Sequence, residues 1–495
     1  MFSAEGHTGL SKKGIIMQKL FDVIVVGGGG SGLATAVSAA QKGASVIVFE
    51  KRPELGGSTG IAIGSFTANR TVYQRKEGIE DHPDDHEKDA GLFGAAEIQA
   101  RNNSHMRRFF LEHSADSLEW LMEMGLSFYG PSPEPPNRVP RMHNVIPNAK
   151  AYIAILQSRF ITLGGTMMCN ALVADLVQEA GRVTGVRTRI AGKTIAFSAR
   201  RGVVLATGDY TNSPELIGKY KGARFTKIEG INPHSTGEGH FLAERVGAKL
   251  LNMDITYGPE MRFVPPPRKP FSQLLPATGF SARLMARLLP LVPQRLINAM
   301  IKRLLVTWQH PEDKLFAEGA ILINRRGERF CDEKTTPERE IAIAEQPEKM
   351  CYILLDKRLM QLFSAWPYYI STAPEIAYGY VADYRRMRPD ITVVAPGLQR
   401  LAKLRGLSVD RLQAAVETFN RYAAGQAEDP FGRTGDDKPL EQGQWMLLGP
   451  AKAYFSTAEG GVSINTSFQV LGADGQPIEG LYAVGSTGLS GMILW

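Results

Sequence analysis

The sequence predicts an α/β fold in which parallel strands alternate with helices, and three observations near its start carry that prediction. An apolar run from Phe21 to Val26 has the length and composition of a short buried strand. Apolar residues then recur at helical spacing from Leu33 to Ala40, and Gly43 is a suitable stop. A second apolar run spans residues 45–49. A strand, a helix and a second strand in this order form a unit whose two strands lie parallel in one sheet.

The turn between the first strand and the helix has the spacing G-x-G-x-x-G. Gly27 permits a tight turn, Gly29 lets the backbone approach a pyrophosphate, and Gly32 lets the helix pack closely on the strand. The start of the helix offers amide N–H groups to phosphate oxygens. Glu50, at the end of the second strand, can accept hydrogen bonds from ribose hydroxyls. This Rossmann-like unit predicts a dinucleotide site and leaves NAD and FAD open as ligands.

The segment after Glu50 is small and rich in hydroxyl groups. It includes Gly56-Gly57-Ser58-Thr59 and ends at Gly64-Ser65. It resembles the loop that wraps the FAD pyrophosphate in the family of fumarate reductases, succinate dehydrogenases and 3-ketosteroid dehydrogenases. The resemblance implies that FAD is held without a covalent bond, because some relatives attach the flavin through a histidine where this chain has Ser58 and Thr59.

Three further segments resemble elements of the same family in the expected order. Residues 203–208 resemble a strand and turn that pass the flavin, and residues 480–485 resemble the second flavin-contacting strand. Residues 235–239 resemble a motif that opens a helix, with Glu238 where an aspartate is usual. Together with the glycine motif, the resemblance assigns these residues to FAD: Gly27, Gly29, Gly30, Ser31, Gly32, Glu50, Lys51, Gly56, Gly57, Ser58, Thr59, Gly64, Ser65, Val173, Ala206, Thr207, Gly208, Glu238, Gly485 and Ser486.

The resemblance also implies the domain organisation: a Rossmann-like FAD-binding domain, with a parallel sheet and helices, and an inserted α+β capping domain. The length of 495 residues agrees, because it is too great for a single core. We expect a disordered extension at 1–17, the FAD-binding domain at 18–256 and 457–495, and the capping domain at 257–456. Relatives continue beyond the strand that ends at Gly485, so we expect that this chain is truncated.

Two segments of the capping domain have recognisable patterns. Residues 318–330 predict a strand, a turn and a second strand, which resemble a hairpin of the family. Residues 412–422 predict an amphipathic helix with Leu412, Val416 and Phe419 on its apolar face. Both patterns indicate structure rather than catalysis.

The segment from residue 262 to residue 308, here called the basic insert, contains eight Lys or Arg residues and no Asp or Glu. Pro290 and Pro293 separate two short helical patterns within it. The second pattern has an apolar face formed by Leu296, Ile297, Met300, Ile301, Leu304 and Leu305. One interpretation is a pair of helices with a buried apolar face and solvated charges. The alternatives are a lid over a lipophilic substrate or a weak membrane-surface contact, and a docking face for an acidic electron-transfer partner.

Composition argues against several other classes. No apolar stretch approaches the ~20 residues that span a bilayer. Cys169, Cys331 and Cys351 are too far apart for a local metal motif and fit a reducing compartment, so we predict a cytoplasmic protein, with membrane-peripheral placement as an alternative. His82 and His86 stand in an acidic helix start, so we expect no metal. The basic residues are not interleaved with aromatic ones, which argues against nucleic acid.

The resemblance implies the chemistry. Members of the family add or remove two hydrogens across a carbon–carbon bond next to a carbonyl group, and a protein acid or base handles the proton. Soluble fumarate reductases place an arginine acid where this chain has Pro337, and Arg339 follows two residues later. Thr457 and Gly258 stand where two substrate histidines are expected. A dicarboxylate needs several cationic partners, so these departures argue against fumarate and succinate.

Tyrosines are dense in the capping domain, and ketosteroid dehydrogenases of the family use tyrosines to polarise a ketone and to take its proton. Tyr378 lies in the dense group and Tyr257 lies near the hinge, although tyrosines also cluster for packing alone. We therefore predict three candidate catalytic residues: Arg339, Tyr257 and Tyr378.

Three hypotheses follow. The first is an FAD-dependent oxidoreductase that acts on the CH–CH bond next to the carbonyl of a largely apolar, steroid-like ketone. The second is a reductase of a carboxylated alkene with Arg339 as the acid. The third is a flavin-binding electron-transfer subunit that has no substrate of its own and docks through the basic insert. The electron donor or acceptor is not identified by the sequence.

Overall fold

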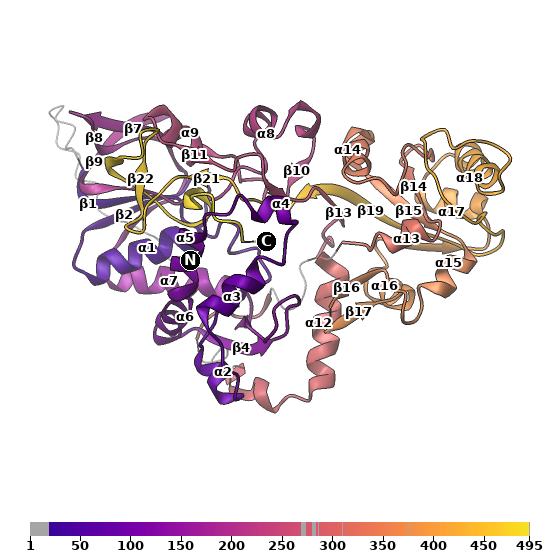
Figure 1. The fold of residues 1–495 in the computed structure, drawn as a ribbon, viewed down its shortest axis with the longest axis horizontal. Helices are drawn as coiled ribbons and strands as arrows, with labels where there is room; N and C mark the ends of the chain where they lie inside the picture. The colour runs from indigo at the N-terminus through magenta and orange to yellow at the C-terminus, as the bar shows by residue number, and fades with distance from the viewer. Residues whose placement is uncertain are drawn as a thin grey trace.

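The computed structural model describes residues 19–268, 274–279, 284–285, 287–308, 310–374 and 376–494. The predicted extension at residues 1–17 lies outside the described residues. Figure 1 shows two lobes: an α/β lobe formed by the two ends of the chain, here called the nucleotide lobe, and a cap lobe formed by its middle. The long strand β19 (Trp445–Phe455) connects the cap lobe with the nucleotide lobe.

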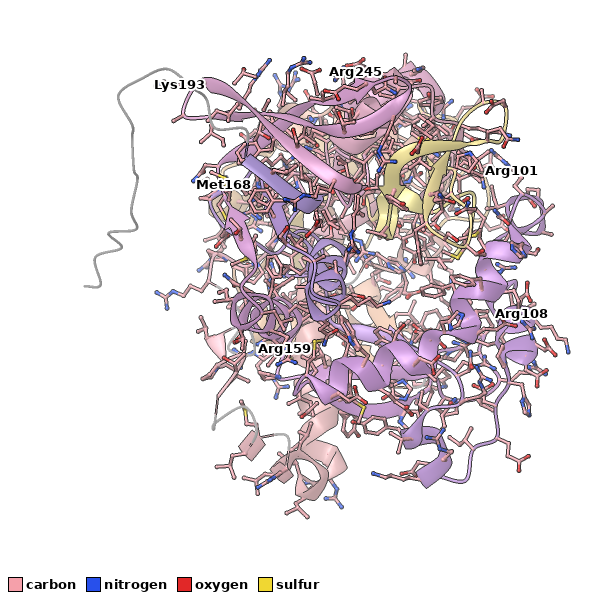
Figure 2. All side chains as sticks on the ribbon, turned by 90° about the vertical axis from the view of Figure 1, so that its left-hand side faces the viewer. Arg101, Arg108, Arg159, Met168, Lys193 and Arg245 are labelled. Atoms are coloured by element: carbon pink, nitrogen blue, oxygen red, sulfur yellow. The ribbon has the colours of Figure 1, made fainter. Side chains whose placement is uncertain are left out.

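The nucleotide lobe is built on a largely parallel sheet of order β22-β23-β9-β1-β2-β6. The predicted pairing is confirmed, because β1 lies parallel to β2 on one side and to β9 on the other. In Figure 2, Met168 marks the edge strand β6 and Lys193 the start of β9. The strands are β1 (Lys19–Val26), β2 (Val46–Phe49), β6 (Thr166–Met168), β9 (Lys193–Leu205), β22 (Gln469–Leu471) and β23 (Pro477–Ala483), with the attached hairpin β7 (Ala171–Glu179) and β8 (Arg182–Ile190).

Both faces of this sheet are buried, which explains the uninterrupted apolar runs. Val25 and Val48 lie in the core that includes α1 (Gly30–Gln41) and α7 (Lys150–Thr162). Ile24 and Ile47 point the other way, into the core that includes α9 (Glu238–Arg245). The alternation follows from the two-residue repeat of a strand.

Shorter elements complete the nucleotide lobe. A small sheet of order β3-β5-β4 lies beside the helical segments. These elements are β3 (Ser65–Thr67), α2 (Val72–Lys76), α3 (Pro83–Ala90), α4 (Ala96–Gln99), α5 (Ser104–Glu112), α6 (Ser114–Glu123), β4 (Ser127–Ser132), β5 (Met142–Ile146), α8 (Pro214–Tyr220), η1 (Ala223–Phe225), β11 (Leu250–Leu251), β12 (Thr256–Tyr257), β20 (Thr457–Ala458), β21 (Gly461–Val462) and η4 (Gly485–Gly488).

The cap lobe is built around β19, which pairs with β10, β13, β15 and β18. Trp445 at the start of β19 and Phe419 of α18 are fully buried in its core, and Cys331 and Cys351 are buried in the same core. The strands are β10 (Glu229–Gly230), β13 (Glu260–Phe263), β14 (Ile321–Asn324), β15 (Cys351–Leu355), β16 (Ser371–Ala373), β17 (Ala377–Gly379) and β18 (Thr392–Ala395). The helices are η2 (Leu289–Leu291), α12 (Gln294–Trp308), α13 (Lys314–Ala317), α14 (Glu338–Glu345), η3 (Pro347–Lys349), α15 (Lys357–Leu362), α16 (Val381–Met387), α17 (Leu398–Arg405) and α18 (Val409–Ala423).

The hairpin predicted at residues 318–330 is wrong in its second half. Its first strand is β14, but β14 pairs with β15 rather than with residues 328–330. Arg329 explains the difference, because its guanidinium is drawn into a buried ion cluster with Glu333 and Asp429. Because the backbone at Arg329 directs this side chain into the cluster, residues 328–330 do not form a strand paired with β14.

The second helical pattern of the basic insert is confirmed as α12, but its predicted burial is only partly right. At its end, Leu305 and Val306 are buried where α12 packs against β16, β17 and α16. Leu296, near its start, is exposed. Figure 1 shows why: α12 runs away from β16 and β17 toward the lower edge of the view. Among the described residues, no helix is both long enough and apolar enough to span a bilayer.

Candidate active site

The three motif glycines of the nucleotide lobe meet different surroundings. Gly27 has a φ of +111°, and a Cβ there would overlap the carbonyl oxygen of Ala206. A Cβ at Gly32 would overlap the carbonyl oxygen of Gly27, which is the close approach of helix and strand that the motif predicts. A Cβ at Gly29 would lie 3.8 Å from the nearest atom beyond its chain neighbours, the Cα of Gly57. Gly29 therefore leaves space that a phosphate group can use.

Glu50 lies at the base of a pocket formed where the sheet strands end. Its Oε2 accepts a hydrogen bond from the amide of Gly28 at 2.9 Å, and its Oε1 accepts one from the amide of Arg52 at 2.9 Å. These bonds fix the carboxylate and leave lone pairs for ribose hydroxyls. The pocket is lined by Val26, Gly27, Phe49, Glu50, Lys51, Ala171, Leu172, Val173, Thr207 and Glu238. The structure thus brings five predicted cofactor residues together with Gly27.

Lys51 and Glu238 form an ion pair at the rim of this pocket. The Lys51 Nζ donates to Glu238 Oε1 at 2.7 Å, to Thr236 Oγ1 at 2.6 Å and to the carbonyl of His234 at 2.7 Å. Burial would raise the pKa of Glu238, but hydrogen bonds from Lys51 and Thr236 hold it below its ordinary value. All three donors of Lys51 are used, so in this structure Lys51 positions the start of α9.

The loop predicted to wrap the pyrophosphate divides into two parts. Gly56 forms a parallel bridge with Gly29, and Thr59 lies against Gly30. Ser58 accepts a hydrogen bond from Asn232 at 2.9 Å. The second part is held by other elements: the Gly64 carbonyl accepts from Tyr152 at 3.1 Å, and the Ser65 hydroxyl donates to Asn144 at 2.9 Å. Residues 56–59 therefore face the glycine turn, whereas residues 64–65 belong to the small β3-β5-β4 sheet.

Thr207 and Thr487 close the site where β9 and η4 meet. Their hydroxyls lie 3.2 Å apart, and Thr487 also donates to the carbonyl of Gly208 at 2.9 Å. The amide of Gly239, in the first turn of α9, donates to Thr207 at 3.0 Å. Gly485 has a φ of +61°, and a Cβ there would overlap the hydroxyl of Ser31. The first and last segments of the chain therefore meet at one cradle, as the predicted residues Ala206 to Gly208 and Gly485 to Ser486 require.

A second polar group lies at the hinge between the lobes. It comprises Tyr257, Glu260, Arg262, His310, Asp313 and Arg339, here called the hinge cluster. On β13, Arg262 Nη2 contacts Glu260 Oε2 at 2.7 Å and Ser456 Oγ at 3.2 Å. Burial and the nearby Glu260 carboxylate raise the pKa of Tyr257, so its phenol stays protonated at neutral pH.

His310 is at the centre of the hinge cluster. Its Nδ1 is buried and has no hydrogen-bond partner among the described residues. Burial lowers the pKa of His310, so the imidazole is neutral at pH 7. The carboxylates of Glu260 and Asp313 raise this pKa and the positive charges of Arg262 and Arg339 lower it, so all four charged groups lie near the ring.

Arg339 is almost fully buried on α14. Its Nε donates to Glu340 at 2.8 Å, and its Nη1 donates to Asp313 at 2.7 Å and to the carbonyl of Glu333 at 3.1 Å. Burial opposes the charge, but the carboxylates of Glu340 and Asp313 raise the pKa of Arg339 above its ordinary value. The side chain of Asp313 is 75% exposed, so the buried Arg339 guanidinium is paired with a carboxylate that contacts solvent.

Tyr378, the third predicted catalytic residue, lies outside the hinge cluster. It is on β17 and packs edge-on against Trp366 with ring centroids 5.2 Å apart, and against Tyr369 at 4.9 Å. This is the packing role that tyrosines commonly have. Tyr257 and Arg339 each have a neighbour in the hinge cluster, whereas Tyr378 lies in an aromatic group.

A short stretch of chain connects the hinge cluster with the cofactor cradle. Tyr257 pairs with Thr457 across β12 and β20, and Thr457 donates to Glu459 at 3.2 Å. A Cβ at Gly461 would touch the carbonyl of Thr487, which is part of the cradle. Three residues of chain, 458–460, therefore lie between Thr457 and Gly461.

Sequence reasoning missed Glu260, His310 and Asp313, and it treated Arg262 only as a charge of the basic insert. The signal for the first was present, because Glu260 and Arg262 are two residues apart and so share one face of a strand. His310 and Asp313 gave no signal, since their neighbours come from distant segments.

Comparison with protein families matches the family described as FAD binding domain over residues 22–269 and 289–494. The chain is 27% identical over 475 residues to NADH:fumarate oxidoreductase of Klebsiella pneumoniae, which covers 94% of this chain and 44% of that protein. It is 26% identical over 479 residues to urocanate reductase of Eggerthella lenta, covering 94% of this chain and 69% of that protein. The chain thus spans less than half of the first relative and about two thirds of the second.

Among solved structures, the fold is similar to the open conformation of a flavocytochrome c3 fumarate reductase. The TM-score is 0.68 with 25% sequence identity, and the match covers 96% of this chain and 74% of that chain. The predicted resemblance and the predicted fold class are confirmed by these matches. The residues around Gly27, Glu50 and Thr207 fit the phosphate and ribose parts of the cofactor that the family binds.

Proposed function

This chain belongs to the FAD binding domain family, and from that premise we propose that it reduces a carbon–carbon double bond conjugated to a single carboxylate. The observation that carries the proposal is that Arg262 and Arg339, held by the carboxylates of Glu260 and Asp313, both lie close enough to His310 to affect its charge. Two charged guanidinium groups beside a neutral imidazole suit an anionic substrate, because charge-assisted hydrogen bonds are the strong ones. This favours the carboxylated alkene, the second hypothesis from the sequence, over a purely apolar ketone.

The names of similar proteins support this substrate class. Fumarate and urocanate, the substrates named for the Klebsiella and Eggerthella proteins, are both carboxylated alkenes. Thr457 and Gly258 stand where histidines are expected in enzymes that bind two carboxylates. A substrate with one carboxylate and a less polar remainder agrees with both observations.

Each member of the hinge cluster has a task in the proposed reaction. When bound, FAD supplies the hydride that goes to the carbon remote from the carboxylate. Arg262 and His310 bind the carboxylate and stabilise the negative charge that develops on it. Arg339 gives a proton to the adjacent carbon, and Asp313, which is open to solvent, returns a proton to Arg339. One hydride and one proton are then added across the double bond.

The proposal is tested by anaerobic photoreduction of the flavin, followed by addition of one acceptor at a time. We expect an aryl-substituted acrylate to reoxidise the flavin promptly, and fumarate and a cyclic enone to do so slowly. Reoxidation by the enone alone would contradict the proposal. Reoxidation by fumarate alone would show that a dicarboxylate fits despite Thr457 and Gly258.

Two variants separate substrate binding from proton transfer. For Arg262→Gln we expect KM for the acrylate to rise by at least about tenfold with a smaller change in kcat, because a charge-assisted contact is lost. For Arg339→Gln we expect kcat to fall about 10²–10⁴-fold, as for loss of a general acid. The FAD absorbance of each variant reports whether the cradle is intact, and Arg326→Gln, on an exposed turn, is the control. An unchanged kcat in Arg339→Gln would exclude Arg339 as the proton donor.

A second candidate substrate is an apolar ketone, and the placement of Tyr257 favours it. The raised pKa of this phenol keeps it protonated, and its hydroxyl, now hydrogen-bonded to Glu260, would exchange that partner for a carbonyl oxygen of the substrate. For this candidate Tyr257→Phe would abolish reoxidation by the cyclic enone, whereas Arg262→Gln would leave it unchanged. The opposite pattern would support the carboxylated alkene.

A further inference from the structure

We propose that the basic insert is a docking surface for an anionic lipid bilayer. The inference is independent of the proposed function, since none of its residues except Arg262 belongs to the hinge cluster. It starts from a surface of exposed leucines in the described part of the insert. Their exposed fractions are 64% for Leu274, 42% for Leu284, 48% for Leu288, 78% for Leu291 and 58% for Leu296.

Two places in the insert pack against the rest of the molecule. Ala277 packs against the core of the nucleotide lobe beneath α7. Leu305 and Val306 are buried in the cap lobe. Figure 1 shows the start of α12 at the lower edge of the molecule. Figure 2 shows Arg159 of α7 near the same lower part of the molecule. Scattered single leucines on a surface are ordinary, but a segment that exposes five within 23 residues is a candidate interaction site.

The charged residues of the insert itself are all positive. Arg268, Arg287, Arg295 and Arg303 are exposed and have no ion-pair partner among the described residues. Lys302, by contrast, pairs with Asp383 at 2.7 Å. The whole insert carries eight cationic residues and no acidic one, so it would repel a second copy of itself.

An anionic bilayer fits this combination best. Leucines can enter the boundary between headgroups and acyl chains, while the long arginine side chains reach back to lipid phosphates. An acidic protein would satisfy the arginines, but it would leave the most exposed leucines, such as Leu291, at a polar interface. Each cation close to an anionic membrane strengthens binding about fivefold.

The test is cosedimentation of the full chain with vesicles. One set is phosphatidylcholine alone, and the other contains about 30% phosphatidylglycerol, each at low salt and at ~0.15 M salt. We expect binding to the anionic vesicles that weakens with salt, and little binding to the neutral ones. Absence of binding to anionic vesicles would overturn the proposal, and binding to soluble polyglutamate instead would indicate an acidic protein partner.

Three variants distinguish the contributions. Arg287→Glu with Arg295→Glu and Arg303→Glu should weaken vesicle binding at least about a hundredfold, at about fivefold for each charge. Leu288→Ser with Leu291→Ser and Leu296→Ser should weaken it at least about tenfold. The matched control is Arg400→Glu with Lys403→Glu and Leu404→Ser on α17, whose side chains are also exposed and which should bind as the unmodified chain does. If the leucine variant binds normally, or if the control loses as much as the insert variants, the proposal is wrong.

Discussion

At the scale of single residues, the three motif glycines of the nucleotide site differ in whether a Cβ atom would fit at each position. Gly27 and Gly32 have none, because a Cβ at either would overlap a carbonyl oxygen of the protein itself. Gly29 has room, since the nearest atom that a Cβ there would meet beyond its chain neighbours is 3.8 Å away. Two glycines are thus required by the fold, and at the third the fold leaves space for a ligand.

The two roles predict opposite effects of the same substitution. Gly32→Ala should lower the free energy of unfolding by about 1–3 kcal/mol, the cost of overpacking a close contact. Gly29→Ala should change that free energy by less than about 0.5 kcal/mol but weaken FAD binding at least about tenfold, because the methyl group fills the space for phosphate. Urea unfolding without FAD and a fluorescence titration with FAD measure the two quantities. Gly29→Ala with unchanged FAD affinity would contradict the role assigned to Gly29.

Residue type alone does not reveal which polar groups are free. Lys51 and Glu50 were both predicted to contact FAD, and both line the pocket. The ammonium group of Lys51 also donates to His234, Thr236 and Glu238. These partners lie almost two hundred residues away, and no local pattern contains them.

At the scale of elements, the cap lobe is held together by a buried network of charges. Arg433 donates to Glu333 at 2.7 Å and to Asp437 at 2.6 Å, and Arg329 donates to Glu333 at 2.8 Å. All these side chains are almost completely inaccessible. Glu333 therefore joins the segment after β14 to the segment after α18.

Removing one charge of this network should be costly. Glu333→Gln leaves two buried guanidinium groups with less compensation, and we expect a loss of about 3–5 kcal/mol of unfolding free energy. Glu328 lies on the same segment as Glu333 and forms a solvent-exposed ion pair with Arg411 of α18. Glu328→Gln should lower the free energy of unfolding by less than about 1 kcal/mol. Urea unfolding followed by circular dichroism measures both. Equal losses in the two variants would mean that the buried network adds nothing beyond surface pairing.

Elements with a local pattern were predictable, and elements with distant partners were not. The β-α-β unit at residues 21–49, the helix start at Glu238 and the apolar face of α18 each follow from residues close in sequence. The second strand of the hairpin at 318–330 failed because β14 pairs with β15 instead. The hinge cluster combines β12, β13, α14 and a loop, so its geometry required the folded chain.

At the scale of the whole molecule, buried histidines set the response to acid. Burial lowers the pKa of His240 to about 4, and burial with nearby Arg141 lowers that of His86 to about 4. Both values lie below the ordinary histidine pKa of about 6.5, so the unfolded chain binds more protons than the folded one between these limits. The stability that depends on neutral histidines is present above pH 6.5 and is lost as the pH falls toward 4.

We therefore expect the free energy of unfolding to fall on acidification from pH 7 to pH 5, by roughly 2 kcal/mol for each of these two residues. His240→Gln should reduce that fall, whereas His113→Gln, at an exposed site, should not. Urea unfolding at the two pH values measures the change. A fall of the same size in His240→Gln would show that other groups govern the acid response.

The position of β23 has a consequence for the synthesis of the chain. In the finished sheet, β23 pairs with Val203 to Leu205 of β9, and these three residues are largely or fully buried. About 270 residues, including the whole cap lobe, separate β9 from β23. At ~5–20 residues per second a ribosome needs about 15–55 seconds to make that stretch. Throughout this interval the nascent nucleotide lobe presents an apolar, unpaired strand edge, which is the period in which a chaperone would have most to protect.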